Sequence, residues 1–256
     1  MKILTSLILL LSFLEVSAQK NRKGEISYYV FNANGEPCKI EEGKFIGILE
    51  KLADTAWQWK YYNFTGPIIS VETYRDREMT LPHGYFAFFD DNGIIDSSGF
   101  TSKGKKNKTW YYYSDSLTVW QSEEYNNGIL IKRMSGAELR SRRENPGDTN
   151  DTSEFDQVEK EATFRGDIKA WVKYLEKNLQ FPDRAKQLDK QGKVMINFVV
   201  DADGSVGDIS LAQSVEFSLD EEALRLIRQS PKWAPAIQKG KPVKAYRRQP
   251  VTFAFR

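Results

Sequence analysis

The sequence predicts an α+β protein with three parts: an N-terminal antiparallel sheet of repeated β-hairpins, a polar linker, and a small C-terminal domain with two or three helices on an antiparallel sheet. Aromatic residues recur at intervals of 26 and 25 residues in the first half, nearly vanish in the middle, and give way to helical spacing near the C-terminus. The expected boundaries are 1–18 for a signal peptide, 25–133 for the repeats, 134–163 for the linker and 164–256 for the C-terminal domain.

The first residues predict export. Lys2 precedes an apolar run over residues 3–14, and residues 16–18 form a cleavage pattern before Gln19. As a helix this run would reach about 18 Å, whereas a membrane span crosses about 30 Å of hydrocarbon. We therefore expect a cleaved signal and a protein of the periplasm or cell envelope. An uncleaved inner-membrane anchor is the alternative, which Glu15 disfavours.

Composition excludes several classes of function. Lysine and arginine number 37 against 35 acidic residues, so the overall charge does not indicate nucleic-acid binding. The single cysteine, Cys38, cannot form an intramolecular disulfide. Cys38 and the single histidine, His83, have no catalytic motif around them, and Asp201 and Asp203 lack the other ligands of a calcium loop. The chain is therefore not expected to be an enzyme, and no cofactor or metal is expected.

The repeats are marked by pairs of aromatic residues. Each repeat begins with an aromatic residue: Trp59, Tyr85 or Trp110. A second aromatic residue follows three positions later, at Tyr62, Phe88 and Tyr113. After a turn, the returning arm carries a third aromatic residue, at Tyr74, Phe100 and Tyr125. Such runs between turns predict hairpins, and since a lone hairpin is marginally stable, we expect one continuous antiparallel sheet.

These units resemble MORN-like repeats, and a more diverged copy lies around Tyr28 and Phe31. The aromatic side chains have two interpretations at this point. They could form a face that binds sugars or peptides, as in an envelope scaffold or wall-binding protein, or they could simply pack the core of the sheet. The polar residues 141–151 that follow predict a flexible linker, so the two halves are expected to be tethered and not rigidly fused.

The last third begins with an amphipathic helix. Its apolar stripe has helical spacing and consists of Ile168, Trp171, Val172, Leu175 and Leu179. Pro182 is placed to open a short second helix over residues 183–188.

A hairpin and a third helix follow. Residues 193–200 alternate as a strand, residues 201–204 form a turn, and a second strand is expected over residues 205–211. A capping box at residues 218–221 predicts the start of a helix whose buried face comprises Leu219, Ala223, Leu226 and Ile227. The final strand is expected from about residue 243 to 255, with Val251, Phe253 and Phe255 on one side.

The residues of this region resemble the TonB C-terminal domain, in the version common in Bacteroidetes-type bacteria. The resemblance covers roughly residues 158–256 and is carried by Phe181-Pro182, Ala185, Gly192-Lys193-Val194, Phe198-Val199-Val200-Asp201, Asp203-Gly204, Leu219-Asp220, Ala223, Pro231-Lys232-Trp233, Pro235, Gly240-Lys241-Pro242-Val243, Pro250-Val251 and Phe253. It implies helices packed on an antiparallel sheet. It also implies binding of outer-membrane TonB-dependent receptors, which add a short strand to that sheet.

The residues themselves agree with such a mechanism. Pro250 cannot donate a ladder hydrogen bond, so its strand is expected at a sheet edge, or the proline at a bulge or strand end. An edge can accept an extended peptide through main-chain hydrogen bonds. The resemblance places Gln180, Phe181 and Pro182 beside that peptide, with Phe181 where the family has tyrosine. The full predicted partner-binding set is Gln180, Phe181, Pro182, Arg247, Arg248, Gln249, Val251, Thr252 and Phe253.

After Glu222 the chain has nine basic residues and no acidic residue. This asymmetry has two interpretations: protection of an edge strand against aggregation, or attraction of an acidic partner segment or anionic lipid surface. The expected partner is a protein, either an outer-membrane receptor or another envelope protein, and a homodimer through the C-terminal strand is also possible. A Pro-rich spacer and a histidine-bearing anchor helix are not evident in the sequence. A membrane-anchored energy transducer therefore remains an alternative only if the N-terminus is uncleaved.

Overall fold

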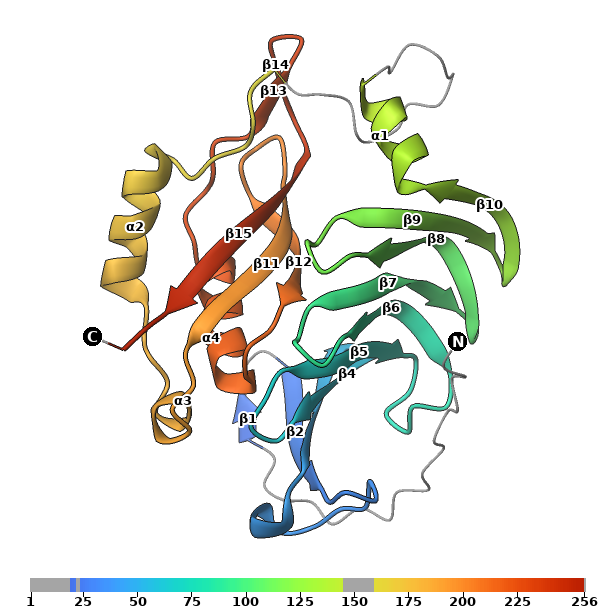
Figure 1. The fold of residues 1–256 in the computed structure, drawn as a ribbon, viewed down its shortest axis with the longest axis vertical. Helices are drawn as coiled ribbons and strands as arrows, with labels where there is room; N and C mark the ends of the chain where they lie inside the picture. The colour runs from blue at the N-terminus through green and yellow to red at the C-terminus, as the bar shows by residue number, and fades with distance from the viewer. Residues whose placement is uncertain (1–18, 22–23, 145–158, 256) are drawn as a thin grey trace.

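The computed structural model describes residues 19–21, 24–144 and 159–255 (Figure 1). The predicted signal peptide therefore lies outside the described residues. In the described part of the chain, no helix is both long enough and apolar enough to cross a membrane. The predicted fold class is confirmed, because a large antiparallel sheet precedes a small domain of helices on an antiparallel sheet.

The first half forms one ten-stranded sheet in which every strand pairs antiparallel with its neighbours in the sequence. A short 3₁₀ helix, η1 (Ile40–Glu42), lies between the second and third strands. The strands are β1 (Gln19–Asn21), β2 (Gly24–Phe31), β3 (Phe45–Ala53), β4 (Ala56–Asn63), β5 (Ile68–Tyr74), β6 (Pro82–Phe89), β7 (Ile95–Ser102), β8 (Lys105–Tyr113), β9 (Val119–Asn126) and β10 (Ile129–Ser135). Consecutive hairpins pair edge to edge, so each one satisfies main-chain hydrogen-bonding groups of the next.

The repeated tryptophans pack on glycines of the neighbouring strand. A Cβ atom at Gly47 would lie 2.3 Å from the Trp59 ring, and one at Gly99 would lie 2.4 Å from the Trp110 ring. Only glycine allows the indole to lie this close to the adjacent strand. Trp59 and Trp110 are both buried, so packing within the sheet accounts for these two aromatic residues.

The expected linker contains more structure than its composition predicts. Residues 134–135 complete β10, and the helix α1 (Gly136–Glu144) follows at once. Ser135 and Glu138 form a reciprocal cap, in which the Ser135 amide donates to the Glu138 carboxylate over 2.6 Å and the Glu138 amide donates to Ser135 Oγ over 3.3 Å. Residues 159–163 are also ordered, because they pair with residues 234–237. The remainder, 145–158, lies outside the described residues.

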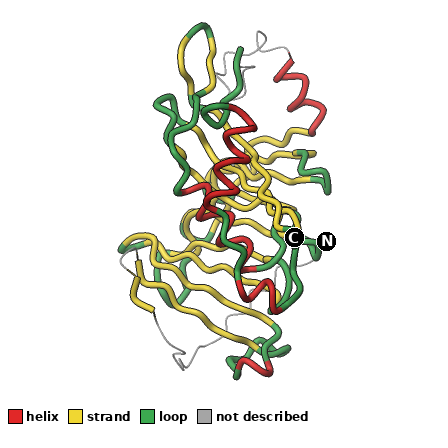
Figure 2. Tube along the Cα trace, turned by 90° about the vertical axis from the view of Figure 1, so that its left-hand side faces the viewer, coloured by secondary structure: helices red, strands yellow, loops and turns green. Residues whose placement is uncertain are grey.

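The C-terminal domain has a three-stranded sheet in the order β12-β11-β15 and a separate small hairpin. The elements are α2 (Asp167–Asn178), α3 (Asp183–Gln187), β11 (Gly192–Val200), β12 (Val206–Gln213), α4 (Phe217–Arg228), β13 (Ala236–Gln238), β14 (Lys241–Val243) and β15 (Ala245–Phe253). Figure 2 shows helix segments on the side of the molecule that faces left in Figure 1. The β13–β14 hairpin was not predicted, and it turns at Lys239 and Gly240, which both have positive φ.

Two sequence-based details of the helices are corrected. The cap of α4 is Glu216 and not Ser218: the Glu216 carboxylate accepts from the Ser218 amide, so the helix begins two residues earlier than predicted. In α2, Trp171 is buried, but Ile168 is 65% exposed and Val172 is 46% exposed. The predicted stripe is therefore only partly covered, since α2 turns Trp171 toward the Phe164 and Trp233 rings of the core.

The expectation that the two halves are merely tethered is wrong. A single hydrophobic core contains residues of β3 to β7 together with residues of β11, β12, α4 and β15. Polar contacts also join the halves, among them an ion pair between Lys60 and Glu221 and a β-bridge between Ile94 and Gln213. The linker composition could not reveal this, because the attachment lies between side chains and turns far from the linker.

Candidate binding edge of the C-terminal sheet

Strand β15 is an edge strand. It pairs with β11 in unbroken register from Ala245–Val200 to Phe253–Gly192, and no other described strand pairs with it. The prediction that Pro250 lies on an edge strand is confirmed. An edge of this kind presents unpaired main-chain groups that an extended peptide can reach.

The side chains of β15 alternate between the core and the solvent. Gln249, Val251 and Phe253 are buried, whereas Tyr246, Pro250 and Thr252 are exposed. Three of the predicted binding residues are therefore core residues, and their side chains are not available to a partner. What remains available along this stretch is the backbone edge and the exposed side chains between the buried ones.

The two arginines of β15 have different surroundings. Arg248 donates from Nε to Asn197 Oδ1 of β11 over 2.8 Å and from Nη1 to the Leu117 carbonyl of the repeats over 3.0 Å, so its side chain is already engaged on both sides. Arg247 is partly exposed, and its Nη1 lies 3.4 Å from Glu161 Oε2. Of the pair, Arg247 is the one whose guanidinium a partner segment could approach.

The predicted aromatic region meets the far end of β15. Phe181 stacks on Phe255 with ring centroids 4.9 Å apart and packs edge-on against Phe253 at 5.9 Å. The Gln180 amide donates to Glu222 Oε1 over 2.7 Å, and Pro182 caps α3. Of the three residues, the structure therefore brings Phe181 into contact with β15.

Two exposed aromatic residues were missed by the sequence reasoning. Tyr246 is 55% exposed at the start of β15, and Phe255 is 42% exposed just beyond its end. The alternation of side chains along the strand could have identified Tyr246, because it places this residue on the face of the sheet opposite to Val251 and Phe253. Phe255 was expected on the inner side, but it follows the last residue of β15 and so leaves the alternation.

The C-terminal basic residues do not form one free patch. Arg225, Lys232 and Lys244 each lie near an acidic side chain: Glu222 at 2.7 Å, Asp203 at 2.7 Å and Asp208 at 3.8 Å. Lys239 and Lys241 are exposed on the β13–β14 hairpin, away from the β11–β15 ladder. Basic side chains on β15 itself are confined to Arg247 and Arg248.

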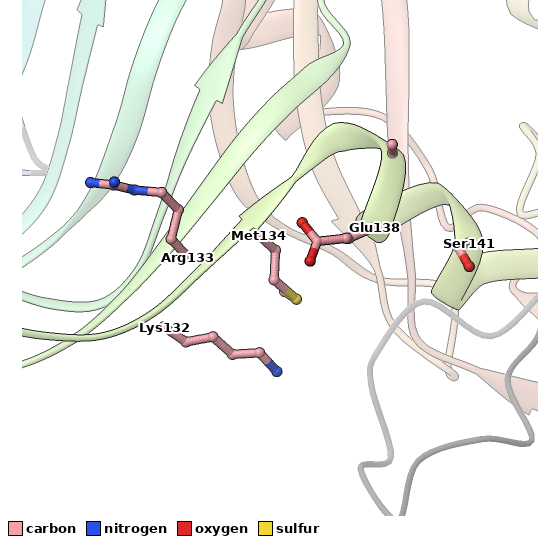
Figure 3. Close-up of a pocket in the computed structure, with 6 residues that line it drawn as sticks. Lys132, Arg133, Met134, Glu138 and Ser141 are labelled. Carbon is pink, nitrogen blue, oxygen red and sulfur yellow. The ribbon is translucent and has the colours of Figure 1, made fainter.

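A shallow hollow lies elsewhere, between β10 and α1. Figure 3 shows Met134 and Glu138 beside it, and its full lining is Lys132, Arg133, Met134, Ala137, Glu138 and Ser141. The Glu138 carboxylate already accepts hydrogen bonds from the amide and hydroxyl of Ser135. This carboxylate therefore serves to cap α1. Within residues 19–21, 24–144 and 159–255, no cluster of three His, Cys, Asp or Glu side chains could hold a metal ion.

Comparison with known proteins finds similarity in the C-terminal domain, which contains this edge. Residues 177–255 match the family model described as Gram-negative bacterial TonB protein C-terminal. The NMR solution structure of Helicobacter pylori TonB-CTD (residues 179-285) is 21% identical, covers 33% of this chain and 77% of that chain, and has a TM-score of 0.27. No curated protein matches the chain significantly. The family match supports a TonB C-terminal domain that contains α3, α4 and all of β11 to β15.

Proposed function

We propose that this chain is an exported, TonB-like envelope protein that binds a partner protein by adding an extended segment of the partner to the free edge of β15. The observation that carries the proposal is the asymmetry of β15, which is fully paired with β11 on one side and unpaired on the other. Main-chain hydrogen bonds would supply affinity, and the exposed side chains of Tyr246 and Thr252 would contribute selectivity.

The partner that fits is an outer-membrane TonB-dependent receptor or another envelope protein with an extended segment. The match to the TonB C-terminal family supports this choice, and the proposal includes a supporting role in TonB-dependent transmembrane transport. Pairing of β15 with a second copy of the chain would use the same edge, so a homodimer is the competing outcome.

The orientation of Pro250 indicates which main-chain groups a guest would use. Pro250 lies opposite Met195 and has no N–H to donate to β11. In an antiparallel ladder, the N–H and C=O of one residue point to the same side. A proline fits an edge strand when its nitrogen faces the free edge, and Arg248 and Thr252, each two residues from Pro250, direct their N–H and C=O groups to the same side.

Thr252→Pro is expected to weaken binding of a synthetic receptor peptide by roughly fivefold in Kd, because about 1 kcal/mol is lost with one main-chain hydrogen bond. The change leaves the ladder with β11 intact, since the lost N–H faces outward. Isothermal titration calorimetry with a peptide of the receptor's TonB-box segment measures the effect. Thr252→Val is the matched control, because it keeps the N–H and alters only the exposed side chain. Equal affinity of the two variants would contradict strand addition at β15.

The proposal also includes export with cleavage of residues 1–18. Sequencing of the mature protein from the cell envelope is expected to begin at Gln19, because the apolar run is too short for a membrane span and ends in a cleavage pattern. A mature protein that begins at Met1 would instead indicate an anchored protein and favour the energy-transducer alternative.

A further inference from the structure

The three-stranded sheet has two edges, β12 and β15, and the repeat sheet pairs with only one of them. The turn between β6 and β7 forms a β-bridge to the end of β12, in which Ile94 lies opposite Gln213. The Ser214 amide donates to the Gly93 carbonyl over 2.8 Å. The main chain of the repeats therefore occupies hydrogen-bonding groups at the end of β12. Figure 1 shows β12 beside the repeats and β15 on the other side of β11.

Buried side chains seal this contact. Ser214 is nearly inaccessible to solvent, and its Oγ accepts from the Ile68 amide of β5 over 2.9 Å while donating to the Asp220 carboxylate of α4. The Phe217 ring, in the first turn of α4, packs edge-on against Tyr28 and Tyr62 of the repeats, with centroids 6.0 Å apart in both pairs. Both an apolar and a polar layer thus hold the repeats at this end of β12.

The rest of β12 is irregular in a way that discourages strand pairing. Its register with β11 shifts twice, between Met195 and Ile196 and between Asn197 and Val199, and Asp208 has a φ of 47°. Bulges of this kind twist an edge away from a flat partner. The register of β15 has no such shift over its nine residues. The hydrogen bond between the repeats and β15 runs from the Arg248 guanidinium to the Leu117 carbonyl, and so it uses no main-chain group of β15.

We propose that the repeat sheet is the built-in occupant of the β12 edge, so that the three-stranded sheet offers only its β15 edge to a guest strand. The end of β12 at Gln213, next to the register shift between Met195 and Ile196, is paired with the Gly93–Ile94 turn. Release of this turn would expose a second acceptor edge, and the strand available to it at high protein concentration is the β12 edge of a second copy. This role of the repeats does not depend on what binds β15.

Gly93→Ala tests the contact directly. Gly93 has a φ of 76°, and a Cβ atom there would lie 2.6 Å from the Ser214 carbonyl oxygen and 2.5 Å from Pro67 Cβ. Gly104→Ala is a matched control, because Gly104 has the same φ of 76° in the β7–β8 turn but nothing lies within 4 Å of its Cβ position. Both variants carry the backbone cost of a positive φ, and only the first adds steric conflict with Ser214, just after β12, and with Pro67.

Hydrogen–deuterium exchange measures how often the Gln213 and Ser214 amides open, and light scattering after gel filtration measures whether the protein dimerises. Neither measurement needs a guest strand on β15. Gly93→Ala is expected to exchange at least tenfold faster there than Gly104→Ala and to form a dimer as its concentration rises. Equal exchange in the two variants would overturn the proposal. Faster exchange in a protein that stays monomeric would overturn it as well.

A cross-link covers the case in which Gly93→Ala fails to fold. Ile94→Cys with Gln213→Cys, in a Cys38→Ser background, places two cysteines at the directly opposed positions of the β-bridge. Opposed positions on adjacent antiparallel strands have the short separation that a disulfide needs. We expect the disulfide to form on mild oxidation and the locked protein to stay monomeric. Failure of the disulfide to form, or dimerisation of the locked protein, would count against the proposal.

Discussion

Replacing Lys60 with methionine is expected to lower the free energy of unfolding by about 3 kcal/mol. Lys60 is 5% exposed, and its Nζ lies 2.7 Å from Glu221 Oε1 and 3.7 Å from Glu50 Oε2. Burial alone would lower the pKa of Lys60, but the carboxylates of Glu221 and Glu50 outweigh burial and raise it. The ammonium is therefore charged in the folded protein. Its removal would leave two carboxylates facing each other between the repeats and α4.

Urea denaturation followed by tryptophan fluorescence measures this loss. The matched control is Lys186→Met, which removes an exposed ion pair with Asp183 at 2.9 Å and is expected to cost less than about 0.5 kcal/mol. Lys60→Met combined with Glu221→Gln should recover part of the loss, because one of the two carboxylates that faced Lys60 is gone. A similar small effect of Lys60→Met and Lys186→Met would show that the ion pair does not hold the halves together.

The stability advantage of the native protein over Asp220→Asn is expected to fall as pH rises from about 4 to 7. Asp220 is fully buried at the junction of the halves, and burial raises the pKa of its carboxyl from 3.8 to about 7, assisted by the nearby Glu221 and Glu216 carboxylates. Hydrogen bonds from Ser214 and Val215 act in the opposite direction.

The direction of this pH dependence follows from the number of protons bound to the folded and unfolded protein. Between pH 4 and 7 the folded protein keeps the Asp220 proton and the unfolded chain loses it. The contribution of Asp220 to the free energy of unfolding therefore declines through this window and levels off above pH 7. A shift of this size corresponds to about 4 kcal/mol. His83 acts in the opposite direction, because burial, Arg75 and Lys103 lower its pKa below 6.5, and it therefore destabilises the fold as pH falls. The difference between the native protein and Asp220→Asn cancels the His83 contribution.

Urea denaturation of both proteins at pH 5, 6, 7 and 8 measures the difference. An asparagine in this position can still accept from the Val215 amide and can donate to Ser214, so the local bonds have replacements. If the difference in free energy of unfolding between the two proteins stays constant across this range, Asp220 does not titrate as its surroundings imply.

The repeat sheet and the edge position of β15 could be predicted from the sequence, because both follow from local chemistry. Trp59, Tyr85 and Trp110 recur with turn residues between them, and alternating aromatic strands separated by turns have few arrangements other than hairpins. Pro250 lacks an N–H, which restricts its strand to an edge whatever the rest of the fold does. The cap formed by Ser135 and Glu138 was equally local, and it could have been recognised in the same way.

The availability of each side chain along that edge depended on the tertiary structure. Arg247 and Arg248 are adjacent and alike in sequence, yet Arg248 forms hydrogen bonds with Asn197 and Leu117 while Arg247 remains partly exposed.

The same holds for helix α2. Val172 has the same helical spacing as Trp171 and Leu175, yet it faces solvent. A hydrophobic pattern states that a residue can be buried, but burial requires a neighbouring element, and the neighbour is set by the packing of the whole domain.

The sequence by itself determined the class of most elements, the order of the two halves and the strand with a free edge, since these depend on backbone chemistry and on residue spacing within short segments. Only the tertiary structure decided that the halves share one core and that the repeats occupy the end of β12. The contacts responsible, Lys60 with Glu221 and Ile94 with Gln213, join residues more than a hundred positions apart. No local pattern encodes such a pairing, because its energy arises only when two folded surfaces meet and lose water together.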